Sequence, residues 1–499
     1  MKLLEMYLLP TTITNPWHSR PIDVHRWSDH PEAIRLAETI WGEHFTDFRD
    51  QEAKPGPKPK TSFKNQLKVL ILDLYVAWLE DPALSIGVPM SANTWDSNSR
   101  YNALHLSKKI IDLVHRLEKA GLVGLAKGSY SGPYAPGNRN TRIRASQALR
   151  ERFQGTKLRE EDIQHHLNEE CIILKDNDEE FGLTHLVDYE DTDVTREMRA
   201  RLRTYNDLLM RTFIDIPSLE EPVIQHGEGE ANRVLVGPSR KFVRRIFNRG
   251  SWTLNGRFYG GWWQHVGKDW RAQIFLNDVP TVEVDFKGLH VAILSAEKGK
   301  PLEGDPYDLP EGTLPGAPPE LQRALIKKLL LTAINARDDK SAFRSFRDGY
   351  PAGHMAKGLS NGELSAFLAA FTKKHPHLAD SICSDQGIRL MNVDAQIAER
   401  ILHRFTQEGI PVLCIHDSFI VPYNHVRKLK AAMGLASRAM VGVPLTVEAS
   451  AAGLDEMRDR PPDILLDFVA WRQSPRCPGY LSRLASHEER WGALPPYAS

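Results

Sequence analysis

Two runs of apolar residues early in the chain recur at three- and four-residue steps, which predicts helices with one buried face. The first run begins near Phe63 and contains Leu67, Leu70, Ile71, Leu74 and Trp78. The second run contains Ile110, Ile111, Val114 and Leu117, with Ser107 as the expected N-cap and Gly121 as the stop. Residues 1–60, before these helices, form an N-terminal segment and a linker whose KPGPKPK sequence (54–60) resists regular structure.

A hairpin is predicted directly after the second helix. The segments LVGLAKG (122–128) and TRIRA (141–145) flank a tip rich in glycine, proline and asparagine. The hairpin carries the basic residues Lys127, Arg139, Arg142 and Arg144. Helices followed by a basic hairpin are typical of a winged helix-turn-helix, whose second helix enters a DNA groove. We therefore expect a winged-helix-like DNA-binding module over 61–158, with a purely structural subdomain as the alternative.

The next region, 159–250, combines opposite charges. Residues 159–193 are acidic and poor in aromatics, which predicts a solvated connector, and residues 195–213 have helical periodicity. The segment SRKFVRRIFNRG (239–250) then places basic residues around two phenylalanines: Arg240, Lys241, Arg244, Arg245 and Arg249. Cations interleaved with aromatics suit a nucleic-acid backbone and its bases, and a solvated helix face is the alternative.

Two predicted strands end in carboxylates. In TVEVDF (281–286) apolar residues alternate with Glu283 and Asp285, which indicates a half-buried strand. In PVLCIHDSFIVP (411–422) two apolar strands flank a tight turn at His416, Asp417 and Ser418. A single aspartate at a strand end is usually a turn residue. Two such aspartates that face each other would instead bind hard divalent cations, as two-metal phosphoryl transfer requires.

A basic helix is predicted between these strands. Arg323, Lys327, Leu331 and Asn335 are spaced by four residues and therefore share one face. Two cations one turn apart repel each other unless an anion such as a triphosphate lies along the face. A basic amphipathic helix without a ligand is the alternative.

Composition narrows the class of protein. The chain has 499 residues, enough for several domains. It has 64 basic and 64 acidic residues, which excludes a histone-like polyelectrolyte. The balance does not exclude a local basic groove. Four scattered cysteines exclude a disulfide scaffold or a zinc ribbon. The start of the chain lacks a signal-peptide pattern and no apolar run reaches membrane-spanning length. We expect a soluble cytoplasmic protein without a membrane partner.

The ordered motifs resemble the family A polymerases, the superfamily of DNA polymerase I and the single-subunit phage and mitochondrial RNA polymerases. VEVDFKGLHVAIL (282–294) resembles motif A, the helix face beginning at Arg323 resembles motif B, and the His416-Asp417-Ser418 turn resembles motif C. GDPYD (304–308), NGRFYGG (255–261) and VPLTVE (443–448) resemble three further elements of the superfamily in the same order. The resemblance covers roughly residues 195–450.

The resemblance implies roles for individual residues. Asp285 and Asp417 would bind two Mg²⁺ ions, or Mn²⁺, and Arg323 and Lys327 would contact the incoming nucleoside triphosphate. Leu331 and Asn335 would lie near the nascent base pair, and His290 would occupy the position that tests the sugar. Arg257 would contact the DNA template and primer or order the site. His416 would touch the primer terminus or support the metal carboxylates, with a role only in the hairpin as the alternative.

The resemblance also implies a fold and an activity. The fold class is α+β: a right-hand polymerase palm with an antiparallel sheet, helical fingers and thumb, and the N-terminal helical or winged-helix module. The expected divisions are 159–250 for the connector and thumb-like helices, 251–320 for palm with motif A, 321–390 for fingers, 391–454 for palm with motif C, and 455–499 for a C-terminal extension. The expected activity is template-directed nucleotidyl transfer in DNA replication, without a proofreading exonuclease.

Departures from the superfamily pattern keep alternatives open. Asn335-Ala336 replaces the usual tyrosine-glycine of motif B, and His290 stands where DNA polymerases have glutamate and the RNA polymerases glycine. The bulk of His290 favours dNTPs, whereas the HDS turn and the Gly-Arg-x-Tyr element favour an RNA polymerase or primase-like enzyme that uses NTPs. Template-independent nucleotide addition would use the same metal site. A non-catalytic replication initiator or mobile-element regulator with a degenerate palm is the alternative from another class.

Overall fold

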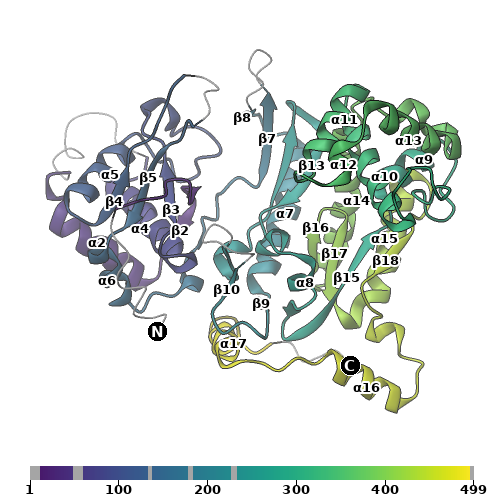
Figure 1. Ribbon diagram of the computed structural model, residues 1–499. Coiled ribbons are helices and arrows are strands. Elements are labelled where there is room, and N and C mark those ends of the chain that lie inside the picture. The colour runs from purple at the N-terminus through teal and green to yellow at the C-terminus, as the bar shows by residue number, and fades with distance from the viewer. Residues whose placement is uncertain (1–11, 49–59, 133–136, 178–183, 226–232, 495–499) are drawn as a thin grey trace.

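The computed structural model describes residues 12–48, 60–132, 137–177, 184–225 and 233–494, which form two lobes joined side by side (Figure 1). The fold is of the mixed α+β class, with largely antiparallel sheets. None of the helices in these ranges combines the length and apolar composition that crossing a bilayer requires.

The first lobe is built around one buried helix. The helix α4 (Phe63–Glu80) is capped by Ser62, whose side chain accepts from Asn65 N, and nearly all of its residues are buried. A four-stranded sheet in the order β1-β3-β5-β4 packs with it. The remaining elements of this lobe are β1 (Ser19–Pro21), β2 (Arg26–Trp27), α2 (Pro31–His44), β3 (Ser85–Val88), α5 (Lys109–Lys119), β4 (Val123–Ala126), β5 (Thr141–Ala145) and α6 (Gln147–Gln154).

The positions of the helices and of the hairpin predicted for this lobe are confirmed. The first predicted helix is α4, which is buried on nearly all sides and not on one face, and the second is α5, whose N-cap is Lys108 and not the predicted Ser107. The predicted hairpin is the antiparallel pair β4–β5, in which Val123 pairs with Ala145 and Ala126 with Arg142. The KPGPKPK linker lies almost entirely outside the described residues.

The segment 159–193 differs from the predicted solvated connector. It contains β6 (Gln164–His165), β7 (Ile172–Asn177) and β8 (Thr184–Leu186), and β7 pairs in parallel with β12 (Arg244–Asn248). Its acidic residues Glu169 and Glu170 are buried because they meet arginines: Glu169 pairs with Arg244, and Glu170 lies 2.9 Å from Arg199. Charge composition alone does not reveal that these acids have buried partners.

The second lobe contains the two sheets that position the candidate chemistry. The first has the order β13-β12-β7-β8, and the second has the order β16-β17-β15-β14-β9, with β18 added to β15. Besides β6, β7, β8 and β12, the strands that follow the first lobe are β9 (Ile214–Asp215), β10 (Val223–Gln225), β11 (Arg233–Leu235), β13 (Ser251–Tyr259), β14 (Phe275–Leu276), β15 (Val279–Phe286), β16 (Leu413–Ile415), β17 (Ser418–Pro422) and β18 (Val447–Ala449).

Helices surround these sheets, and α14 packs along β13. In Figure 1 the helices α9 to α13 gather beside the ends of β15 and β17. The helices of the lobe are α7 (Asp193–Arg211), α8 (Lys268–Arg271), α9 (Leu289–Glu297), α10 (Pro319–Asn335), α11 (Asp339–Asp348), α12 (Met355–Gly358), α13 (Asn361–Lys374), α14 (Gly387–Gln407), α15 (Val426–Val441), α16 (Pro462–Arg472) and α17 (Pro478–Trp491).

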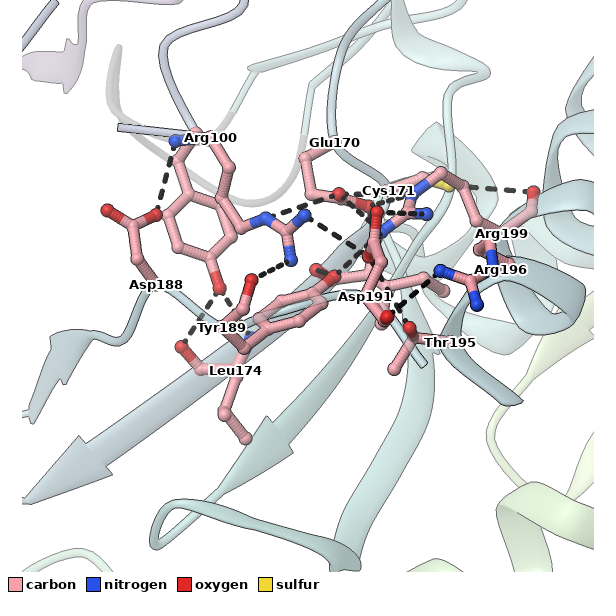
Figure 2. Close-up of polar contacts among 12 residues, drawn as sticks. Arg100, Glu170, Cys171, Leu174, Asp188, Tyr189, Asp191, Thr195, Arg196 and Arg199 are labelled. Atoms are coloured by element: carbon pink, nitrogen blue, oxygen red, sulfur yellow. Dashed lines mark hydrogen bonds and ion pairs between the residues drawn. The ribbon is translucent and has the colours of Figure 1, made fainter. Parts of the chain in front are cut away.

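A polar network ties the loop before α5 to the second lobe (Figure 2). The guanidinium of Arg100 donates to Tyr189 O at 2.8 Å and Asp191 Oδ1 at 3.2 Å, and it lies 3.5 Å from the centre of the Tyr189 ring. Arg199 on α7 contacts Asp191 and Glu170 from the other side. The first lobe is therefore attached to the second lobe by hydrogen bonds and ion pairs as well as by packing.

Candidate functional site

Asp285 lies near the end of β15, the strand between β17 and β18. It pairs with Ser418 on β17 and with Glu448 on β18. Directly paired residues in an antiparallel sheet project to the same face, so these three polar side chains form a row across the sheet. Asp285 and Glu448 are exposed, whereas the neighbours Val284 and Phe286 turn into the core. The alternation predicted for TVEVDF is confirmed.

A two-residue turn brings Asp417 beside Asp285. The strands β16 and β17 pair from Ile415 and Ser418 outward, so His416 and Asp417 alone form the turn. His416 has a φ of +58°, a conformation that costs energy for a residue with a side chain and is often found at functional sites. The N–H of Phe286 donates to Asp417 O at 3.4 Å, which places the turn against the end of β15.

The two carboxylates interact electrostatically. Partial withdrawal from water, the Asp417 carboxylate and Glu283 together raise the pKa of Asp285 to about 7, and the positive charge of Lys327 opposes that rise. Glu283 itself is held by Arg271, at 3.0 Å, and by the Ser418 hydroxyl. Divalent cations fit such a site because carboxylate oxygens are their preferred ligands and a cation removes the repulsion between Asp285 and Asp417.

The cationic face predicted for α10 exists. Arg323, Lys327, Leu331 and Asn335 are all exposed, while the opposite face of the helix packs into the core. Asp305 and, more weakly, Glu448 raise the pKa of Arg323, and Lys327 acts on the pKa of Asp285, so this face looks toward the carboxylate row. Arg323 also forms an ion pair with Asp305, the aspartate of the GDPYD segment.

The end of the α10 face is closely packed. Asn335 Nδ2 donates to Leu331 O at 2.6 Å within the helix. A Cβ atom on Gly387, at the start of α14, would lie 1.7 Å from Asn335 Oδ1. Asn335 is thus seated against α14, and a side chain at position 387 would displace the Asn335 amide.

A buried group of three residues lies behind the turn. Arg257 on β13 donates from Nε to both carboxylate oxygens of Asp394 at 3.0 Å, and its Nη2 lies 3.2 Å from His290 Nε2. His290 Nε2 is also 3.1 Å from Asp394 Oδ2. Burial works to lower the pKa of Arg257, but Asp394 and then Asp417 outweigh it, so the pKa is raised. Arg257 therefore links this group to the carboxylate site.

His290 and His416 both lie among protein atoms. The His290 side chain is 8% exposed, and its Nδ1 has no hydrogen-bond partner among the described residues. The His416 ring meets Tyr259 edge to face at 5.4 Å. Burial and the charge of Arg257 lower the pKa of His416, so its imidazole is neutral at physiological pH.

The basic segment 239–250 requires a correction. It contains the strand β12, and each of its five cations has an internal partner. Lys241 donates to Thr212 O at 2.6 Å and Arg245 lies 2.7 Å from Glu399, both buried. Arg240 pairs with Glu80, Arg244 with Glu169 and Arg249 with Asp385. The prediction that Lys241 and Arg245 bind nucleic acid is wrong, because β12 turns Arg245 inward and Lys241 is buried in the short segment before that strand.

Sequence reasoning missed three residues that shape the site. Glu448 could have been found, because it ends the VPLTVE segment that the sequence analysis singled out, but its pairing with Asp285 is visible only in the structure. Tyr259 carries the ring that supports His416. Asp394 is 2% exposed on α14, and nothing in its neighbourhood along the chain indicates that a long-range arginine partner exists. Among the described residues, no three His, Cys, Asp or Glu side chains gather as a metal site.

No protein-family model matches the chain, and no curated protein matches it in sequence.

Proposed function

We propose that this chain is a template-directed nucleotidyltransferase that extends a primer with nucleoside triphosphates, with dNTPs favoured. The observation that supports the proposal best is the position of the Asp285–Asp417 pair opposite the exposed cationic face of α10. Two carboxylates next to each other, together with two cations one turn apart, match the charges of a metal-bound triphosphate.

The proposed role of each side chain follows from its charge. Arg323 and Lys327 would hold the phosphate oxygens, and Leu331 offers an apolar surface on the same face for a base. Arg257, fixed by Asp394, would keep the positive charge behind the turn in place. Asp285 and Asp417 would hold the metal ions, and the neutral ring of His416 would keep the turn rigid through its contact with Tyr259.

The proposed reaction is in-line phosphoryl transfer. A primer 3′-hydroxyl oxygen forms a bond to the α-phosphorus, the α–β phosphoanhydride bond breaks, pyrophosphate leaves, and the hydroxyl proton passes to solvent. Bound Mg²⁺ or Mn²⁺ would lower the pKa of the attacking hydroxyl and neutralise charge on the leaving oxygen. The bulk of His290 would exclude a 2′-hydroxyl from the sugar position. Its ring is held in place by Arg257 and Asp394.

Primer extension tests this proposal. A recessed DNA duplex with Mg²⁺ receives dNTPs or NTPs in separate reactions, next to the Asp417→Ala protein and the control Asp467→Ala, which changes an exposed acid on α16. We expect template-dependent extension with dNTPs that only Asp417→Ala abolishes. Extension with NTPs would establish the RNA polymerase or primase-like alternative, and extension without a template a terminal transferase. A duplex that is bound but never extended would favour a non-catalytic DNA-binding regulator.

A further inference from the structure

The β4–β5 hairpin of the first lobe (Figure 1) carries cations that are not neutralised inside the protein. Arg139 donates to the Ser129 hydroxyl at 2.8 Å and to Lys127 O at 3.2 Å. Arg142 donates to Pro16 O and to the Ser19 hydroxyl. All of these acceptors are uncharged, and in the described part of the chain neither guanidinium forms an ion pair. This distinguishes the hairpin from β12, where every cation meets a carboxylate.

One exposed aromatic ring lies beside these cations, and a second lies in the hairpin itself. Trp17 is 61% exposed and Tyr130 is 77% exposed. The Arg139 guanidinium lies 5.9 Å from the centre of the Trp17 ring. Arg139 also pairs with Ser129, the neighbour of Tyr130, in a β-bridge. Trp17 therefore lies beside Arg139, and Tyr130 lies one residue beyond this bridge. We call this end of the hairpin, together with Trp17, the Trp17–Tyr130 surface.

Arg142 fixes the geometry of this surface. Its Nε lies 3.1 Å from Pro16 O and 2.7 Å from Ser19 Oγ, so it ties β5 to the segment that carries Trp17. The positive charge of Arg139 and partial burial lower the pKa of Arg142, with burial the larger cause. Like charges held close together are stabilised by an external anion.

The helix that a winged helix-turn-helix would insert into DNA is less suited to the role. On α5, Lys109 lies 3.0 Å from Asp112, and Arg116 pairs with Asp47. Glu118 is exposed on the same helix. Its acids would face the phosphates of a duplex, and two of its cations are already used in ion pairs.

We propose that the Trp17–Tyr130 surface binds single-stranded nucleic acid, with base rings stacked on Trp17 and Tyr130 and phosphates near Lys127, Arg139 and Arg142. Unpaired bases offer faces to aromatic side chains, whereas a duplex keeps those faces stacked inside. The proposal deepens the proposed polymerase function, because a first lobe of this kind would hold the unpaired template ahead of the carboxylate site.

Fluorescence anisotropy with the full chain and labelled oligothymidylate of 20 nucleotides tests the inference, in EDTA and without nucleotides. The variants are Trp17→Ala, Tyr130→Ala and the double variant. The matched control is Trp471→Ala, which removes a ring that is 73% exposed on α16. We expect about a tenfold weaker affinity for each single variant, a larger loss for the double variant, and no change for Trp471→Ala.

Two further measurements keep the test decisive. Binding of a 20-base-pair duplex should change less than twofold in the same variants, and thermal melting should show that the variants fold. Photocrosslinking to an oligonucleotide with 5-iododeoxyuridine should label Trp17 or Tyr130. Wild-type affinity of the double variant for oligothymidylate would overturn the inference, as would a loss confined to the duplex.

This experiment is separate from the test of catalysis, because binding is measured without metal or nucleotide. If the wild-type protein extends primers and the double variant binds oligothymidylate normally, only this inference is overturned. A protein that never extends primers but loses binding in the double variant would overturn only the proposed function.

Discussion

Asp394 shows how one buried carboxylate can organise a site that it does not enter. Its bonds to Arg257 hold a cation whose charge reaches Asp417, and its contact with His290 fixes the third member of the group. The predicted roles of Arg257 in ordering the site and of His290 near the sugar thus depend on the same partner.

Replacing Asp394 with Ala should lower the free energy of unfolding by about 3 kcal/mol, because Arg257 keeps its buried charge without a counter-charge. Chemical denaturation measures this change. The variant Asp394→Asn retains the shape and one acceptor oxygen, so its loss should be smaller. A change below about 0.5 kcal/mol in the alanine variant would contradict the role assigned to this pair.

At the scale of the element, α10 shows which features of a sequence predict structure well. Its four-residue spacing reports directly on which residues share a face, so the exposed face of Arg323 and Lys327 was predictable. The alternation of TVEVDF was predictable for the same reason, because β15 is polar on one side and apolar on the other.

The strand β12 shows where such prediction ends. Its basic composition resembles that of a nucleic-acid-binding segment, but each cation meets a carboxylate from a distant part of the chain. Glu169, for example, is 75 residues from Arg244, and Glu399 is 154 residues from Arg245. Periodicity describes the local backbone, whereas the partner of a buried charge depends on how distant segments meet. For the same reason, the sequence alone does not reveal that Asp394 is the partner of Arg257.

The α10 face should act on nucleotide affinity. We expect Lys327→Ala to raise the KM for the incoming nucleotide about tenfold or more, because a hydrogen bond to a charged phosphate contributes about 1.5–3 kcal/mol. Steady-state incorporation kinetics measure this effect. The control Lys373→Ala removes an exposed lysine from the last turn of α13 and should leave KM unchanged. An equal effect of both variants would argue against a specific phosphate contact.

The helix α17 should confer acid sensitivity. Burial and the charge of Lys241 lower the pKa of His487 from its ordinary 6.5 to about 4. As the pH falls from 6.5 to 4, the unfolded chain binds a proton that the folded chain does not, so stability is lost, by at most about 3 kcal/mol. His487→Phe should preserve the packing on Phe213 and remove this part of the pH dependence, which denaturation at pH 7 and pH 5 measures. An unchanged difference between the two pH values would contradict it.

In the whole molecule, the network in Figure 2 is one of the sets of polar contacts that hold the two lobes together, beside the Arg240–Glu80 ion pair. Arg100 is the residue of the first lobe that makes most of these bonds, to Tyr189, Asp191 and Asp188. Its guanidinium leaves the interface only if the bonds to Tyr189 and Asp191 break together.

Arg100→Ala should loosen the lobes, increase the radius of gyration in small-angle X-ray scattering and speed amide exchange in residues 184–192. The control Arg35→Ala removes an arginine of the first lobe that is 72% exposed and pairs with Glu32 within α2. It should leave both measurements unchanged. If Arg100→Ala behaves like the control, other contacts between the lobes, such as the Arg240–Glu80 ion pair, hold them without this network.

We propose that Asp285 and Asp417 together form one metal-binding site for nucleotide transfer. The most direct test of this claim counts Mn²⁺ ions by electron paramagnetic resonance, with a dideoxy-terminated primer–template and the next complementary dNTP. We predict two bound ions per chain in the wild type and in Asp467→Asn, and none held tightly in Asp285→Asn/Asp417→Asn. The same number of ions in the double variant as in the wild type would contradict the claim.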